Sequence, residues 1–130
     1  MKSIFIVGDQ RIFEKTVVKA DLAVFDAGSV HDVYSTFALG RDAEWSSRLF
    51  VLEMKEAGEE GIGTFLNITH KSPALLGQTV KFIATVANLN KNNVDCDVIV
   101  KVGERIVAEC QTGQKIVSTE KLNLLFESLK

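Results

Sequence analysis

Three residues of this sequence combine types and spacing suited to hydrolytic chemistry, namely Thr36, Glu44 and His70. A hydroxyl can attack a carbonyl or position water, a carboxylate can act as base or nucleophile, and an imidazole can carry a proton. Each residue also has a plainer interpretation. Thr36 can cap a helix, Glu44 can pair at the surface with Arg48 four residues on, and a lone histidine is often a core or interface residue. The residues alone leave both interpretations open.

A predicted helix carries two of these residues. Residues 37–57 lack proline, place apolar side chains at helical spacing and end at Gly58, which predicts a helix capped by Ser35 or Thr36. The hydroxyl of Thr36 would then lie near free backbone amides at the positive end of the helix dipole. A straight helix separates Thr36 from Glu44 by roughly 12 Å along its axis, so direct contact would require a bend.

The third residue falls on a predicted strand. After Gly61 the apolar period changes to two, so that Leu66, Ile68 and His70 share one face. Gly61-Ile62-Gly63 is interpreted as the turn between helix and strand. Further strands are predicted at 11–19, 80–86, 94–102 and 106–117, with a tight turn at Gly103-Glu104 and a short helix at 119–129. This order predicts an α+β domain in which an antiparallel sheet of about five strands packs on one helix.

A family resemblance adds to this interpretation. Ser35-Thr36-Phe37, Glu44-Trp45 and Thr69-His70 resemble the catalytic positions of the fluoroacetyl-CoA thioesterase family, in which a threonine precedes a Glu-Trp pair by eight residues and a histidine follows twenty-six later. The resemblance implies that Thr36, Glu44 and His70 form a catalytic group. It also implies that residues 1–130 form a single hot-dog domain, with a curved sheet wrapped around a central helix, that hydrolyses an acyl-CoA thioester to free acid and CoA.

The resemblance extends over about residues 30–86 and suggests two substrate-binding positions, Val30 and Gly77. Gly77 ends the 73–77 segment, which is similar to a proline and glycine turn of hot-dog thioesterases. Val30 stands six residues before Thr36, where the family has the phenylalanine that gates its fluoroacetyl pocket. We therefore expect small or medium acyl groups to be accepted without a preference for fluorine.

Neither a GxxxxGK phosphate loop nor an HExxH zinc motif occurs, so no cofactor and no metal are expected, and CoA would enter as part of the substrate. Hot-dog relatives pair their sheets, which implies a homodimer or a higher homo-oligomer. Whether catalysis uses a covalent intermediate or direct attack by water stays open. Whether His70 serves its own subunit or its partner is equally open.

Composition restricts the function classes further. Fifteen basic and seventeen acidic residues without a block of one sign predict no nucleic-acid partner. The apolar run at 49–54 is too short to cross a membrane, and no leader is expected at the start. Cys96 and Cys110 lie in alternating apolar runs and are predicted to be buried, reduced thiols, which favours a cytoplasmic location.

Three alternatives remain at this point. A hot-dog enoyl-CoA hydratase would require an aspartate-then-histidine motif, which is missing. A non-catalytic module of the same fold could bind acyl-CoA or an acyl chain, with Thr36, Glu44 and His70 merely lining the pocket. An interaction protein without a ligand is the general background for a small domain.

Overall fold

The computed structural model describes the backbone of residues 1–25 and 28–130 and the side chains of residues 1–24 and 31–130. Its central element is α1 (Thr36–Met54). Of the two predicted caps, Ser35 is the N-cap and Thr36 is the first residue of the helix, and Ser35 Oγ accepts a hydrogen bond of 3.0 Å from the Ala38 amide. The helix ends before the predicted residue 57, because Lys55 is already extended and the Glu59 carboxylate accepts from the Glu56 amide in a tight turn.

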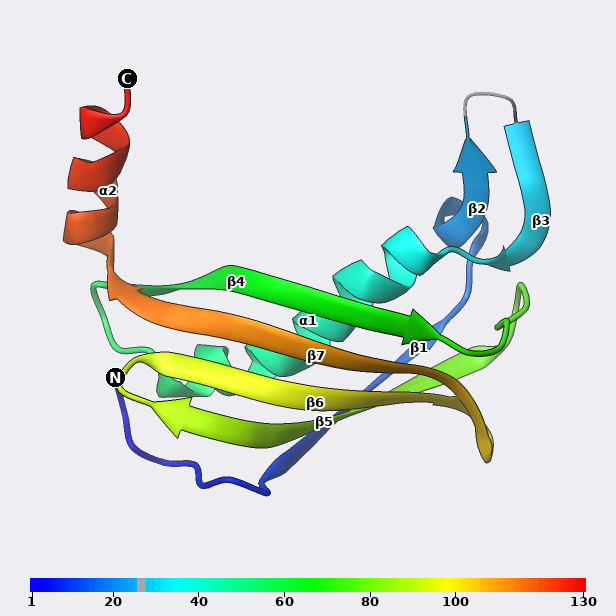
Figure 1. Ribbon diagram of the computed structural model, residues 1–130, viewed down its shortest axis with the longest axis horizontal. Helices are drawn as coiled ribbons and strands as arrows, with labels where there is room; N and C mark the ends of the chain where they lie inside the picture. Colours follow the sequence, from blue (N-terminus) through cyan, green and yellow to red (C-terminus); the bar gives the residue numbers. More distant parts are fainter. Residues whose placement is uncertain (26–27) are drawn as a thin grey trace.

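Five antiparallel strands form the main sheet in the order β1-β5-β6-β7-β4. This confirms the predicted number of strands. The sheet curves over α1, with β4 along one edge and β1 along the other (Figure 1). The strands are β1 (Gln10–Thr16), β4 (Glu59–His70), β5 (Thr79–Asn90), β6 (Asn93–Val102) and β7 (Arg105–Ser118).

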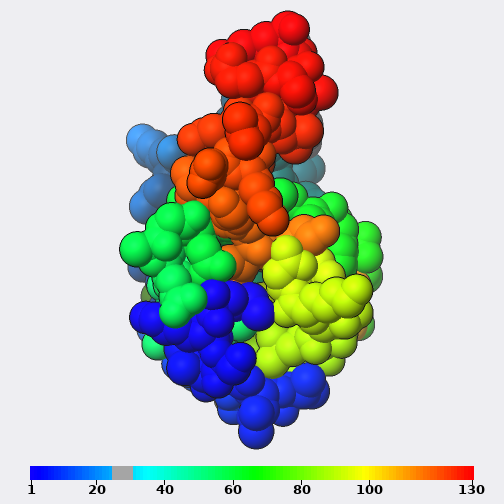
Figure 2. Space-filling view, turned by 90° about the vertical axis from the view of Figure 1, so that its left-hand side faces the viewer, coloured from blue at the N-terminus to red at the C-terminus, as the bar shows by residue number. Residues whose placement is uncertain are grey.

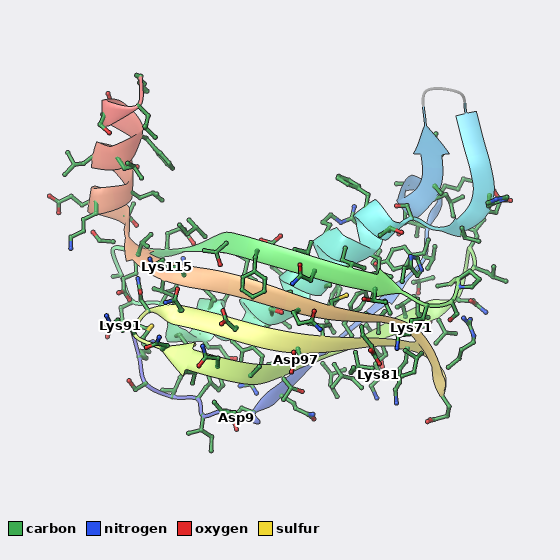
Figure 3. All side chains as sticks on the ribbon, viewed as in Figure 1. Asp9, Lys71, Lys81, Lys91, Asp97 and Lys115 are labelled. Atoms are coloured by element: carbon green, nitrogen blue, oxygen red, sulfur yellow. The ribbon has the colours of Figure 1, made fainter. Side chains whose placement is uncertain are left out.

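Alternation along the strands separates the core from the solvent. In β6, Val94, Cys96, Val98 and Val100 are buried, while Asp97 between them is exposed. The outer face of the sheet carries charged side chains, among them Asp97, Lys81 and Lys115 (Figure 3). Cys96 on β6 and Cys110 on β7 are both free and buried, as the sequence predicted.

A two-stranded hairpin precedes α1 and was not predicted. A short 3-10 turn at Lys19–Asp21 leads into β2 (Leu22–Phe25), which pairs with β3 (Gly28–Tyr34). The predicted first strand at 11–19 therefore stops earlier, at Thr16. β2 lacks alternation and its pairing contains two register shifts, so tertiary contacts hold the hairpin in place. One of these is the hydrogen bond of 2.8 Å from the Tyr34 amide to the Ala74 carbonyl.

The chain ends in α2 (Thr119–Ser128), which confirms the predicted terminal helix. None of its residues is buried, and it projects from the body of the molecule beyond the sheet (Figure 2). Within the described part of the chain, no helix has the length and apolar character needed to span a membrane.

Glycines allow α1 to lie directly on β4. A Cβ at Gly40 would come within 2.7 Å of Ile68 Cδ1, and one at Gly61 would overlap Val51 Cγ1. The helix also buries small residues beneath the sheet, where the Thr112 hydroxyl donates a hydrogen bond of 2.7 Å to Ser47 Oγ. The spacing between α1 and β4 is thus set by the missing side chains of these glycines.

Substitution at Gly61 tests this close packing. Gly61→Ala should lower the free energy of unfolding by about 1–3 kcal/mol, because the added methyl group overlaps Val51. Adding Val51→Ala should make the combined loss smaller than the sum of the two single losses, because each change relieves the other. Urea unfolding of the four proteins measures this coupling, and strictly additive losses would contradict it.

Candidate active site

Two of the predicted catalytic residues are in direct contact. Thr36 is the first residue of α1 and His70 is the last residue of β4, so the packing of helix on strand brings the two ends together. Thr36 Oγ1 lies 2.9 Å from His70 Nδ1, a hydrogen-bonding distance. Because either atom can be the donor, the imidazole can orient the hydroxyl or accept its proton.

The surroundings of His70 favour a neutral imidazole. Burial lowers the pKa of His70, and the backbone of Ser72 opposes this to a smaller extent. A neutral ring at physiological pH can accept a proton. The second ring nitrogen, Nε2, is buried and has no hydrogen-bonding partner among the described residues.

Glu44 lies two turns along α1 and points toward β4. Its carboxylate rests against Gly63, where any Cβ would overlap Oε1. The alternative surface pair with Arg48 does not form, since Arg48 Nη2 donates to Glu60 Oε1 at 2.8 Å and Nη1 to the Gly61 carbonyl at 3.0 Å. The interpretation of residues 61–63 as a turn was wrong, because both glycines belong to β4, and Gly63 accommodates Glu44.

Two grooves meet at Thr36. The larger has a volume of about 740 Å³ and contains Thr36 and His70, with apolar walls that include Leu22 and Val33. The smaller has a volume of about 360 Å³ and contains Thr36 and Glu44. Thr36 therefore lies beside His70 in one groove and shares the other with Glu44, which stands eight residues further along the same continuous helix.

The start of α1 also offers backbone donors. Ser35 Oγ satisfies the Ala38 amide, whereas the amides of Thr36 and Phe37 lie in the first turn, where a helix provides no acceptor. Both residues line both grooves. Their amides are available to stabilise a negative charge that develops at the junction.

The two predicted substrate-binding residues have different positions. Gly77 has a φ of 87° and donates its amide to the Val17 carbonyl at 2.9 Å, in an exposed turn that lines neither of these grooves. The side chain of Val30 lies outside the described residues. Among the described side chains, no group of three or more His, Cys, Asp or Glu residues is placed to hold a metal ion.

Sequence reasoning missed three residues near this site. Gly63 accommodates Glu44, Arg41 lines both grooves, and Gln114 donates its side-chain amide to the Glu44 carbonyl at 3.2 Å. Arg41 follows Thr36 by five positions on the same helix, and this proximity was the only available signal. Gln114 and Gly63 are neighbours only through the pairing of β7 with β4.

Residues 17–120 match the family model described as fluoroacetyl-CoA-specific thioesterase. A solved thioesterase superfamily member from Thermus thermophilus is 29% identical over 98% of this chain and 94% of that chain, with a TM-score of 0.92. No curated protein shows a significant match.

Two further solved structures show the same fold at lower identity. The fluoroacetyl-CoA thioesterase FlK is 17% identical over 97% of this chain and 98% of its own, with a TM-score of 0.87. A hot-dog-like protein from Thermanaerovibrio acidaminovorans is 23% identical over 97% and 94%, also at 0.87. Since the family model spans most of the sequence, the chain belongs to the fluoroacetyl-CoA-specific thioesterase family and is an acyl-CoA thioesterase with the hot-dog fold.

Proposed function

We propose that the protein hydrolyses CoA thioesters of small or medium acyl groups at the junction of the two grooves, with Thr36, Glu44 and His70 as the catalytic group. The observation that carries this proposal is the hydrogen-bonding contact between Thr36 and His70 at the point where a groove containing Glu44 begins. A hydroxyl, an imidazole and a carboxylate on two grooves that share Thr36 are the groups that acyl transfer requires.

The chemistry follows from these positions. The thioester carbonyl lies at the junction, and the amides of Thr36 and Phe37 stabilise the oxyanion. In direct hydrolysis, Glu44 takes a proton from water, the water oxygen bonds to the carbonyl carbon, and the carbon–sulfur bond breaks as the thiolate of CoA receives a proton through His70. In the covalent route, a Glu44 oxygen bonds to the carbonyl carbon and the carbon–sulfur bond breaks, which releases the thiolate of CoA and leaves a mixed anhydride. Water then attacks the anhydride, which regenerates the Glu44 carboxylate and releases the acid, and the proton lost by water passes to the thiolate. Thr36 either positions the reacting groups or is itself the nucleophile. In the second case its hydroxyl loses its proton to His70 Nδ1, its oxygen bonds to the carbonyl carbon, and the thiolate of CoA leaves before water hydrolyses the ester.

The size of the smaller groove supports the proposed range of acyl groups. Its volume of about 360 Å³ equals roughly twelve water molecules at their liquid volume. Leu66 and Ile68 supply an apolar wall opposite the helix, and Gly40 adds no side chain of its own. Mutants of FlK have been solved in complex with fluoroacetate and CoA and in complex with acetyl-CoA, and the acyl groups of these ligands are small. Val30 and Gly77 remain proposed substrate-binding residues.

We also propose that the protein is a homodimer or a higher homo-oligomer. β4 has β7 as its only strand partner among the described residues, and it is twelve residues long. Phe65 on this strand and Trp45 on the adjacent helix are each more than 40% exposed. A long open edge with apolar side chains is a site for pairing with another strand, here β4 of a second copy.

A cytoplasmic location is part of the proposal. Burial raises the pKa of both cysteine thiols, Cys96 and Cys110, to about 11. Thiols of this kind stay protonated and unreactive, and reduced buried cysteines are typical of cytoplasmic proteins.

Substitution of the two principal catalytic residues tests the assignment. Glu44→Gln and His70→Ala should each lower kcat for acetyl-CoA by on the order of 10²-fold or more, because each removes a group that transfers a proton or attacks the carbonyl. Thr36→Ala should lower kcat by a smaller factor, since water can partly replace a positioning hydroxyl. Free thiol release under saturating substrate measures kcat.

Matched controls for this experiment come from the same chain. Glu53→Gln changes a carboxylate near the far end of α1, and His31→Ala changes an exposed histidine, and neither residue lines either groove. Both controls should keep wild-type turnover. Unchanged turnover in both Glu44→Gln and His70→Ala would instead support the non-catalytic binding module.

Fluorine selectivity is a separate expectation. The ratio of kcat/KM for fluoroacetyl-CoA to that for acetyl-CoA should stay within the intrinsic reactivity difference of the two thioesters, because Val30 provides less side chain than the phenylalanine it replaces. Val30→Phe serves as the comparison and should raise the ratio. A strong wild-type preference for fluoroacetyl-CoA would place the selective residue elsewhere.

Sedimentation at micromolar concentration tests the assembly. The wild type should sediment as a dimer or larger species, and Phe65→Lys should shift it toward monomer by placing a charge on the β4 edge. Ile12→Lys is the matched control, because Ile12 is comparably exposed on β1, the opposite edge of the sheet. A monomeric wild type, or dissociation by Ile12→Lys alone, would contradict pairing through β4.

A further inference from the structure

Two buried carboxylates lie near the start of α1, one in the preceding 3-10 turn and one on the helix itself. Asp21 and Asp42 expose only 2% and 6% of their surface. Lys15 Nζ bonds Asp21 Oδ1 at 2.9 Å and lies 3.3 Å from Asp42 Oδ2, and the Tyr34 hydroxyl donates to Asp42. Arg41 completes this cluster, which joins β1, the hairpin and α1.

Arg41 is held along one side of its guanidinium. Nε donates to Asp42 Oδ1 and Nη2 to Asp42 Oδ2, both at 3.0 Å, while Nη2 also donates to Asp21 Oδ1 at 2.9 Å. This paired geometry fixes the plane of the guanidinium. Nη1 has no partner among the described residues, and half of the side chain is exposed.

The open side of Arg41 belongs to the active-site grooves. Arg41 lines both of them, and it follows Thr36 by five residues, about 7.5 Å along the helix axis. Lys19 also lines the larger groove, and none of the described residues lining that groove is acidic, whereas the smaller groove contains one acidic residue, Glu44. A fixed cation therefore faces the cavity close to the site of hydrolysis.

Stability alone is a weak explanation for this cluster. Buried ion pairs are often no more stabilising than apolar residues of similar volume, because burying charges carries a large desolvation cost. Two buried carboxylates do, however, hold a half-exposed guanidinium in one orientation. Such a donor is prepared to bind an anionic oxygen without losing further side-chain entropy.

We infer that Arg41 is a specificity-determining residue that binds a carboxylate at the far end of the acyl group, so that CoA monothioesters of short dicarboxylic acids are preferred substrates. The inference rests on the proposed function and names its substrate class. The phosphates of CoA are a less suitable partner, because the whole pantetheine arm separates them from the thioester. Arg41, in contrast, lies only five residues after Thr36 on the same helix.

Thioether analogues of CoA test the inference by binding alone, since they cannot be hydrolysed. S-carboxyethyl-CoA and S-propyl-CoA differ mainly in the terminal carboxylate. Calorimetry on the wild type should give a dissociation constant for S-carboxyethyl-CoA on the order of ten times lower than for S-propyl-CoA, the gain of a charge-assisted hydrogen bond. Arg41→Gln should abolish this difference and leave S-propyl-CoA binding within about twofold.

Lys15→Met is the matched control, because Lys15 contacts the same two carboxylates but lines neither groove. It should retain the preference for the carboxylate. An equal preference in the wild type and Arg41→Gln, or loss of the preference in Lys15→Met as well, would overturn the inference.

Two further outcomes separate this inference from others. If Arg41→Gln weakens both CoA analogues equally, and the loss disappears with the corresponding pantetheine analogues that lack phosphates, Arg41 binds the CoA phosphates and the carboxylate assignment is wrong. Failure of the wild type to hydrolyse any acyl-CoA, malonyl-CoA and butyryl-CoA included, would instead refute the proposed function, while the binding comparison still decides the role of Arg41.

Discussion

The close packing of α1 on β4 is the constraint on which the site depends. Glycines at positions 40, 61 and 63 let the helix approach the strand until a Cβ at any of them would collide with a neighbour. This approach brings the first residue of the helix to the last residue of the strand, which creates the Thr36–His70 contact. It also turns Glu44 toward the strand rather than toward solvent. The same packing therefore supports the core and positions the three residues of the proposed catalytic group.

The polar groups of the site are held from a second direction by the hairpin and its charged cluster. The Ser35 amide donates to the Asp21 carbonyl at 2.8 Å, so the residue that caps α1 is tied to the turn before β2. The Asp21 side chain in turn binds Lys15 and Arg41. The start of the helix is thus fixed by both backbone and side-chain bonds. A fixed helix start keeps Thr36 and Phe37, which line both grooves, in a constant position, as the proposed stabilisation of an oxyanion requires.

An exposed apolar edge lies beside this site. β4 carries His70 at its end and Phe65 near its middle, so the strand that contributes a proposed catalytic side chain is also an edge strand of the sheet among the described residues. The smaller groove includes Leu66 and Ile68 from that strand. Pairing of a second copy along β4 would therefore restrict access of water to the smaller groove, which links the proposed assembly to the proposed chemistry.

The sequence by itself determined the order of the long strands and the two α-helices, limited the helix cap to Ser35 or Thr36, and determined the inward faces of the long strands. Local propensity and the periods of two and 3.6 act over neighbouring residues, which is why these features could be predicted. It also singled out Thr36, Glu44 and His70, through long spacings that resemble a family. Only the tertiary structure decided what these residues touch. The hairpin before α1 lacks a periodic signal, and its place depends on contacts with residues far along the chain, such as the bridge between Val33 and Leu75.

The same limit applies to the smaller details of the site. From the local sequence, Gly63 is typical of a turn. Its lack of a side chain leaves room for Glu44 only when α1 packs on β4. From the local sequence, Arg41 is typical of an exposed arginine on a helix. Its fixed orientation depends on the buried Asp21, which lies twenty residues earlier in the chain. Sequence patterns report which side chains share a face of one element. Contacts between faces of different elements arise only when the chain folds.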